Sequence, residues 1–172
     1  MGNLLFDTPS KINTGAVFSE CRRYRYMLWR IWDESKPLIQ FIGLNPSTAN
    51  ETANDNTMRR VIRYAKDWGY GGVYMMNLFA IVSTDPKILK TCEDPLGEND
   101  KYLKEINGKC QDVLFAWGNF DVFGRDKAVE KMFSNAVVLG YNKNNSPKHP
   151  LMCRADLKPQ PYIYNRQNGR TD

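Results

Sequence analysis

Four short apolar runs, separated by segments with helical character, constrain the fold of this chain most strongly. The first run, Leu38–Ile42, is too short for a buried helix and is bounded by Pro37 and Gly43, so we expect a central strand. The other strands are expected within 73–81, 112–119 and 136–140. Strands that alternate with helices imply right-handed crossovers and a mainly parallel sheet covered on both faces. The sequence therefore predicts an α/β protein with a three-layer α/β/α arrangement.

The helix after the first strand has recognisable boundaries. Its apolar positions follow helical spacing: Met58, Val61, Ile62, Ala65 and Trp68. Asp55 or Asn56 can cap the amino end, and Gly69 can end the helix. The opposite side carries four basic residues, Arg59, Arg60, Arg63 and Lys66. We therefore expect a helix that is basic on its exposed side, with an amino end that favours an anion. Further helices are expected over 98–106 and 125–133.

Length and composition favour one globular domain. With 172 residues the chain can bury one full core, so we expect a single domain over 1–172 with a frayed tail at 167–172. A formal charge of +5 suits a polyanionic partner. The four cysteines form no C-x-x-C pair, so we expect free thiols and no zinc site. No apolar segment is long enough to span a bilayer and no signal-peptide pattern is present, so we expect a cytoplasmic protein.

The segment Gly15–Asp33 interleaves aromatic residues with arginines. Alternation between Arg23 and Leu28 predicts an edge strand whose polar face carries the arginines. Two interpretations stay open for the segment. Either the aromatic side chains fill the core and the arginines cover it, or together they form a surface that stacks on bases and contacts phosphates. A second edge strand is expected within 159–164.

Polar side chains follow several of the predicted strands. Asn45 follows the first strand, after a break that glycine and proline impose. Asn77 lies at the end of the second strand, and Trp117-Gly118 ends the third. The single histidine, His149, lies between two prolines in an extended loop after the last strand. Ligands of open α/β sheets bind at the carboxyl ends of the strands, so we expect these residues to meet at one site.

Short motifs at these strand ends resemble the uracil-DNA glycosylase superfamily, especially its mismatch-specific and thymine-DNA branch. The first motif of that branch, G-x-N-P-G, is similar to Gly43-Leu44-Asn45-Pro46, with Ser47 in place of the second glycine. The late His-Pro loop resembles the run from Ser146 to Leu151, and the base-reading amide resembles Asn77. The runs C-R-R-Y-R-Y, L-N-P-S-T-A, N-L-F-A and P-K-H-P-L also resemble, over nearly the whole chain, an uncharacterised prokaryotic and phage family, domain-of-unknown-function family 1643.

The glycosylase resemblance implies a hydrolase that cleaves the N-glycosidic bond of a flipped-out uracil-like or modified base in DNA. It implies that Asn45 orients the water, with Asp55 as an alternative activator. It also implies that Asn77 reads the base edge and Phe79 stacks on the base, while His149 clamps a phosphate or donates to the leaving base. Further substrate contacts are implied for Gly43, Leu44, Pro46, Ser47, Trp117 and Gly118. DNA-backbone contacts are implied for Arg59, Arg60, Ser146 and Lys148.

Two other functions stay open. A DNA-binding or sensor domain that does not cleave is favoured by the weak basicity of a side-chain amide. An enzyme that acts on a free nucleotide or a base-modification intermediate would hold its phosphate with the helix end and His149. No G-x-G-x-x-G or P-loop lysine motif follows a predicted strand, so no dinucleotide site or Walker-type site is expected. We expect DNA as the partner of a monomer, with no metal, cofactor or membrane.

Overall fold

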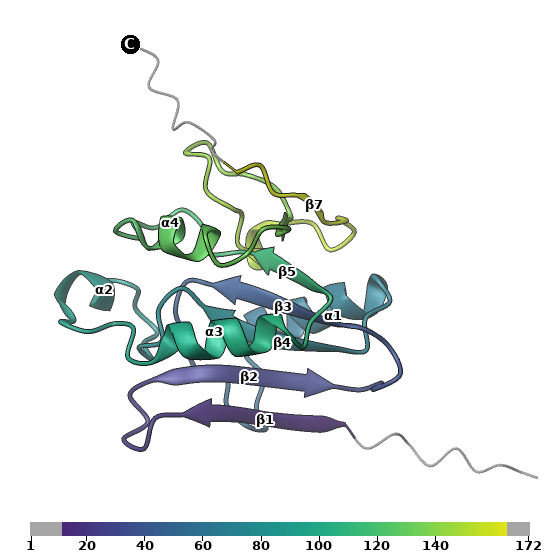
Figure 1. Ribbon diagram of the computed structural model, residues 1–172, viewed down its shortest axis with the longest axis horizontal. Helices are drawn as coiled ribbons and strands as arrows, with labels where there is room; N and C mark the ends of the chain where they lie inside the picture. Colours follow the sequence, from purple (N-terminus) through teal and green to yellow (C-terminus); the bar gives the residue numbers. More distant parts are fainter. Residues whose placement is uncertain (1–11, 165–172) are drawn as a thin grey trace, which may run out of the picture.

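The computed structural model describes residues 12–164, so the predicted tail at 167–172 lies outside the described residues. Within 12–164 the chain forms one sheet with helices on both sides (Figure 1). The strands are β1 Asn13–Phe18, β2 Arg25–Ile31, β3 Leu38–Gly43, β4 Gly72–Asn77, β5 Asp112–Phe115, β6 Val137–Val138 and β7 Gln160–Pro161. The helices are α1 Asn56–Asp67, α2 Ile88–Thr91, α3 Asn99–Asn107 and α4 Arg125–Glu130, with a short 3-10 helix, η1, at Pro150–Met152. None of these helices has the length and hydrophobicity needed to cross a bilayer.

The sheet is mixed, and its centre is parallel. The strand order is β1-β2-β4-β3-β5-β6-β7. Strands β4, β3, β5 and β6 pair in parallel, whereas β1, β2 and β7 join their neighbours antiparallel. The predicted α/β class and the mainly parallel central sheet are therefore confirmed. Strand β3 lies in the middle, as its apolar run predicts, and β7 lies at an edge, as expected for 159–164.

Strand β3 shows how the apolar run builds the core. Ile39 and Phe41 belong to the cluster under α1, whereas Ile42 belongs to the cluster under α3, and none of the three has exposed surface. A central parallel strand is buried on both faces, which is why its apolar residues do not alternate with exposed polar ones. The polar residue within the run, Gln40, is fully buried, and its Nε2 donates to Met76 Sδ and to the Leu103 carbonyl. The strand then ends at Gly43, where the chain leaves the sheet.

Helix α1 begins and ends where the sequence predicts. The Asp55 side chain accepts a hydrogen bond from the backbone N–H of Met58 at 2.8 Å, which makes Asp55 the N-cap. Gly69, with a φ of +85°, follows the helix in the left-handed region that favours glycine. Of the four basic residues, Arg59, Arg63 and Lys66 are exposed and Arg60 is half-buried. The predicted basic outer side is therefore largely confirmed.

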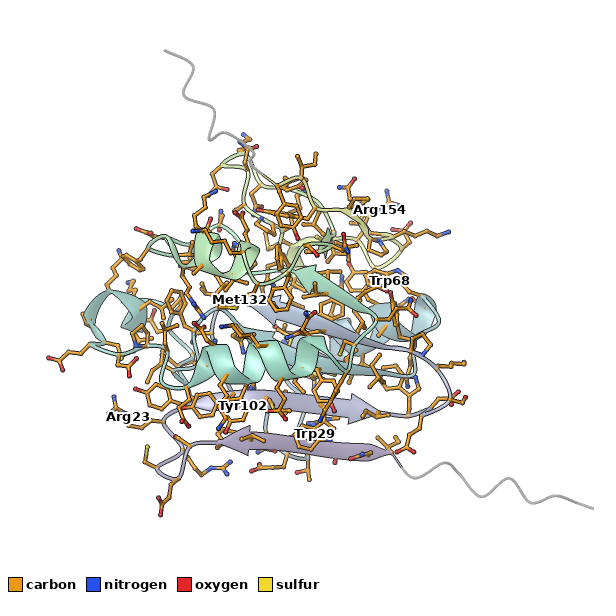
Figure 2. All side chains as sticks on the ribbon, viewed as in Figure 1. Arg23, Trp29, Trp68, Tyr102, Met132 and Arg154 are labelled. Atoms are coloured by element: carbon orange, nitrogen blue, oxygen red, sulfur yellow. The ribbon has the colours of Figure 1, made fainter. Side chains whose placement is uncertain are left out.

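Helices α3 and α4 cover the opposite face of the sheet (Figure 1). They bury Leu103, Ile106 and Val129 in the cluster that contains Ile42. Tyr102 of α3, labelled in Figure 2, stacks on Tyr26 of β2 with ring centroids 4.7 Å apart. Helix α3 agrees with its predicted range to one residue at each end, whereas α4 ends three residues before the predicted 133.

The prediction of an exposed basic edge strand near the amino terminus is wrong. Strand β2 lies inside the sheet, between β1 and β4, and β1 takes the edge. Arg25 and Arg30 keep only 4% and 3% of their surface exposed. The Arg30 guanidinium donates to the side-chain oxygen of Asn54 and to four backbone carbonyls, so its polar atoms are satisfied inside the protein. The aromatic residues of this segment fill the core, as one of the two interpretations held.

Candidate functional site

A cavity of about 440 Å³ opens at the carboxyl ends of the parallel strands. Its walls come from the segments after β3 and β5, the end of β4, the start of α1 and the region of η1. The arrowheads of β3 and β5 point the same way in Figure 1, so the segments that follow them meet at one edge. Nine residues singled out in the sequence line this cavity: Gly43, Leu44, Asn45, Ser47, Asp55, Asn77, Trp117, Gly118 and His149.

Asn45 holds two strand ends together and presents one acceptor. Its Nδ2 donates to the backbone carbonyls of Pro46, Ile81 and Ser83 at 3.1, 3.3 and 3.0 Å. Carbonyl oxygens only accept, so these three contacts fix which end of the amide is nitrogen. No hydrogen bond within residues 12–164 reaches its Oδ1. Asn45 can therefore offer an oriented carbonyl oxygen to a water or ligand.

Asn77 is buried but has no partner for its side chain. Only 4% of its surface is exposed, and no hydrogen bond joins its amide to any residue between 12 and 164. It pairs in register with Gly43 of β3, and a Cβ at position 43 would lie 2.9 Å from Asn77 Oδ1. The missing side chain of Gly43 thus leaves room for the Asn77 amide, which lines the cavity with a donor and an acceptor free.

Asp55 is the one carboxylate among the described residues that line the cavity. One of its oxygens caps α1 through the Met58 N–H, and no hydrogen bond within 12–164 reaches the other. The positive end of the α1 dipole stabilises a negative charge at this position. The cavity therefore contains one carboxylate oxygen that can accept a proton from a bound water.

His149 is held as a neutral hydrogen-bond donor. Its Nδ1 accepts a hydrogen bond from the backbone N–H of Leu151 at 3.2 Å, so the ring proton of the neutral form resides on Nε2. Burial lowers the pKa of His149, and the negative charge of Asp55 opposes this only in part. Gly118, with a φ of +79°, donates its N–H to the Pro147 carbonyl and so fixes the loop after β5 against this segment.

Arg25 lines the same cavity, although the sequence did not single it out as a site residue. A bulge in β2 directs it there. Val17 of β1 pairs with Met27 and the next residue, Phe18, pairs with Arg25, so Tyr26 is an extra residue in β2. Tyr26 packs under α3, and Arg25 turns to the α1 side of the sheet. Burial lowers the pKa of the Arg25 guanidinium to about 10, so Arg25 stays cationic at neutral pH.

Phe79 does not occupy the position that the base-stacking role requires. It is 4% exposed, packs in the cluster under α3, and is not part of the cavity wall. The chain leaves β4 after Asn77, so the alternation of the strand no longer determines where Phe79 points. The buried ring that does line the cavity is Trp117, which packs on Phe115 with ring centroids 4.7 Å apart. Phe79 therefore does not line the cavity, and Trp117 is the buried aromatic side chain in its wall.

The residues with implied DNA-backbone roles lie outside the cavity wall. Arg59 donates to the Asn54 carbonyl and the Asn56 side chain at the start of α1. Arg60 donates to the Cys153 carbonyl at 2.6 Å and so ties α1 to the segment after η1.

Ser146 and Lys148, the other two residues of the predicted phosphate clamp, also lie outside the cavity wall. Pro46 lies outside it as well and is buried beside Asn45. The Ser146 hydroxyl donates to Asn144 Oδ1 at 2.6 Å within its own turn. Lys148 is half-buried, and its methylene chain lies close to Gly140. His149 is thus the member of its loop motif that reaches the cavity together with Leu151.

Three exposed apolar side chains lie at the rim of the cavity. Phe120, Leu151 and Met152 line it with 56%, 42% and 76% of their surface exposed. Exposed apolar side chains grouped around a polar pocket are typical of a surface that contacts a ligand or partner. Within residues 12–164, no group of three His, Cys, Asp or Glu side chains is arranged to hold a metal ion.

Comparison with known families gives one match. The sequence model of the family described as "Protein of unknown function (DUF1643)" matches residues 25–151. No curated protein and no solved structure matches the chain. The matched range begins at Arg25 and ends at Leu151, so it includes every cavity residue discussed above except Met152.

Proposed function

The chain belongs to the DUF1643 family, and we propose that it hydrolyses the N-glycosidic bond of a uracil-like or modified nucleotide whose base enters the cavity. A glycosidase of this kind needs three things from its pocket. It must recognise the base edge, aim a water at the anomeric carbon, and stabilise the base as it leaves with the bonding electrons. The cavity wall supplies a group for each task.

The unpartnered amide of Asn77 is the observation that carries this proposal. The two polar atoms of this amide are not among the fully buried atoms without a partner, so both can be reached from the cavity. A ligand in the cavity can therefore replace water as their hydrogen-bond partner. An amide offers a donor and an acceptor side by side, which is the pattern on the edges of nucleobases. Trp117 provides an aromatic wall of the same pocket for the base.

Asp55 and Asn45 are the groups for the attacking water. The water oxygen forms a bond to the anomeric carbon while the bond from that carbon to the base nitrogen breaks. The proton of the water passes to the free oxygen of Asp55, and the Oδ1 of Asn45 orients the water by accepting its other hydrogen. The base leaves with the electron pair, and the Nε2–H of His149 donates a hydrogen bond to it. This assignment makes Asp55 the base, because a side-chain amide is too weakly basic for that task.

DNA is the first substrate to test. The exposed residues Arg59, Arg63 and Lys66 lie along α1, which begins at the cavity, and the chain carries a formal charge of +5. Basic side chains beside a base-sized pocket suit binding to phosphates around an extruded nucleotide. The G-x-N-P motif around Asn45 and the His-Pro pair at His149, which resemble uracil-DNA glycosylases, support the same chemistry.

The test is base release from defined substrates. Duplexes carrying uracil, hydroxymethylated or glucosylated pyrimidines are incubated with the protein and assayed for alkali-labile abasic sites, and free bases are measured by chromatography. Asp55→Asn should lower the rate at least ~100-fold, the usual scale for loss of a general base. Asparagine caps a helix as well as aspartate does, so Asp55→Asn should fold normally. Asp67→Asn, at the far end of α1, is the matched control. Saturable binding of these duplexes, with no base released from them or from deoxynucleoside monophosphates, would refute the catalytic proposal and leave a binding module.

A further inference from the structure

Arg25 and Arg30 are two buried arginines of β2 that differ in how many of their guanidinium N–H groups are hydrogen-bonded. Both are at least nine-tenths buried. Arg30 has hydrogen bonds from all three guanidinium nitrogens, so its role in the fold is complete. Arg25 has a single guanidinium hydrogen bond, from Nη1 to the Ala49 carbonyl at 3.0 Å. Arg25 is therefore a buried cation with most of its donors unused.

Two guanidinium nitrogens of Arg25, Nε and Nη2, have no hydrogen bond within 12–164. Nε is fully buried, whereas Nη2 is not among the fully buried atoms without a partner, so the N–H groups of Nη2 are the donors that a ligand can reach. Arg25 also forms part of the cavity wall. The cavity therefore presents a positive charge with an accessible N–H donor, which is a site suited to an oxyanion.

Asp55 does not satisfy this cation. No ion pair within 4.0 Å joins Arg25 to a carboxylate of the described residues. Burial lowers the pKa of Arg25 to about 10, although the nearby charge of Asp55 acts in the opposite direction. Asp55 is instead used by the Met58 N–H and the positive end of α1. His149 is neutral, so it does not supply a competing cation.

We propose that Arg25 binds a phosphate of the ligand, and that the substrate is therefore a small phosphate-bearing nucleotide held whole in the cavity. The nucleotide part of this statement rests on the proposed function; the oxyanion site does not. A phosphate inside a DNA strand continues into sugar on both sides, so it cannot easily reach a side chain that is 96% buried. A terminal phosphate monoester can. A cavity of about 440 Å³ is within the range that encloses a small ligand.

The first arm of the test uses inorganic phosphate alone. Titration into the whole protein is followed by calorimetry and by the NMR signal of His149, the single histidine. We expect saturable binding that Arg25→Met weakens at least 30-fold. Arg23→Met is the control, because it also removes one positive charge from this segment. Arg23 lies two residues before Arg25, and its side chain is exposed and extends from the molecule in Figure 2. Arg25→Lys keeps the charge but loses the donor at the position of Nη2, and should weaken binding at least fivefold even if Arg25→Met does not fold.

The second arm distinguishes a nucleotide phosphate from free phosphate. Each common deoxynucleoside monophosphate is compared with its nucleoside, with and without added phosphate. At least one monophosphate should bind 30-fold more tightly than its nucleoside, and phosphate should compete with it. Phosphate binding that is absent, or equal in Arg25→Met and Arg23→Met, would overturn the oxyanion site. Phosphate binding without preference for any monophosphate would restrict the site to free phosphate and overturn the nucleotide assignment.

These outcomes separate the two proposals. If phosphate binds through Arg25 and no base is released from any substrate, the glycosidase proposal fails and the oxyanion site stands. If bases are released from DNA or nucleosides and Arg25→Met changes neither rate nor phosphate binding, the glycosidase proposal stands and the oxyanion site fails.

Discussion

Replacing Asn77 with leucine should remove base recognition while leaving the stability of the fold nearly unchanged. Leucine has the same branching as asparagine, and the Asn77 amide has no hydrogen bond to lose within the described residues. The residue is 4% exposed, but its amide atoms are not among the fully buried atoms without a partner, so water in the cavity can reach them. We therefore expect the free energy of unfolding to change by less than about 1 kcal/mol, which for a chain of this size is less than about 2–4 °C in Tm.

Asn99→Leu is the matched comparison. Asn99 is 1% exposed, but its Nδ2 donates to the carbonyls of Asn77 and Leu78 at 2.8 and 3.1 Å. Leu78 would keep a donor from Arg125 Nε, whereas the Asn77 carbonyl would be left with none from a side chain. Two lost hydrogen bonds and one unsatisfied carbonyl cost about 2–3 kcal/mol, and removal of Asn99 Oδ1, which is itself buried without a partner, offsets about 1 kcal/mol of this. Asn99→Leu should therefore lower Tm by roughly 5 °C, whereas Asn77→Leu should leave it almost unchanged.

Thermal and urea unfolding of both variants, followed by circular dichroism, measures this difference directly. Base release or ligand binding is then measured on the same samples, and Asn77→Leu should have lost it. If Asn77→Leu loses as much stability as Asn99→Leu, the Asn77 amide is bonded within the folded protein. It would then be structural, and the reasoning that assigns base recognition to it would be wrong.

Three further predictions concern titration, thiol reactivity and space in the cavity. Because folding lowers the pKa of His149, its contribution to the free energy of unfolding should be constant above about pH 6.5 and fall as the pH drops below that value. Urea unfolding between pH 7 and 5 should therefore show a shallower loss of stability for His149→Gln than for the unmodified protein. A hydrogen bond with a nearby serine hydroxyl lowers the pKa of the exposed Cys21, and burial raises the pKa of Cys110 to about 12, so mass spectrometry should find Cys21 alkylated well before Cys110. Gly43→Ala would place a methyl group 2.9 Å from Asn77 Oδ1, so ligand affinity should fall at least tenfold in calorimetry, with a stability loss of about 1 kcal/mol; unchanged affinity would mean that the ligand does not approach this part of the wall.

The convergence of the polar strand ends could be predicted because it follows from topology. Asn45 and Asn77 end neighbouring parallel strands, so they must lie at the same edge once the sheet forms. The boundaries of α1 were predictable for a different reason, since Asp55 and Gly69 act on the backbone within one turn of themselves. Signals of these two kinds are local or follow from strand order, and both are present in the sequence.

The failures come from interactions between distant segments. Strand β1 has the sequence N-T-G-A-V-F, which lacks a continuous apolar run, so nothing indicated that β2 would be covered by another strand. The burial of Arg25 and Arg30 follows from that pairing, together with carbonyl acceptors that the loop between β3 and α1 supplies. Phe79 lies just beyond the last residue of β4, where a side chain follows the path of the loop and no longer the period of the strand.

The extra residue in β2 makes the site depend on how the first two strands pair as well as on side-chain chemistry. Arg25 faces the same side of the sheet as its partner Phe18 because Tyr26 is left out of the ladder. If the two strands paired without the bulge, so that Tyr26 stood opposite Phe18, Arg25 would face the α3 side, away from the cavity. Every residue of the pocket could then be retained while the anion site vanished.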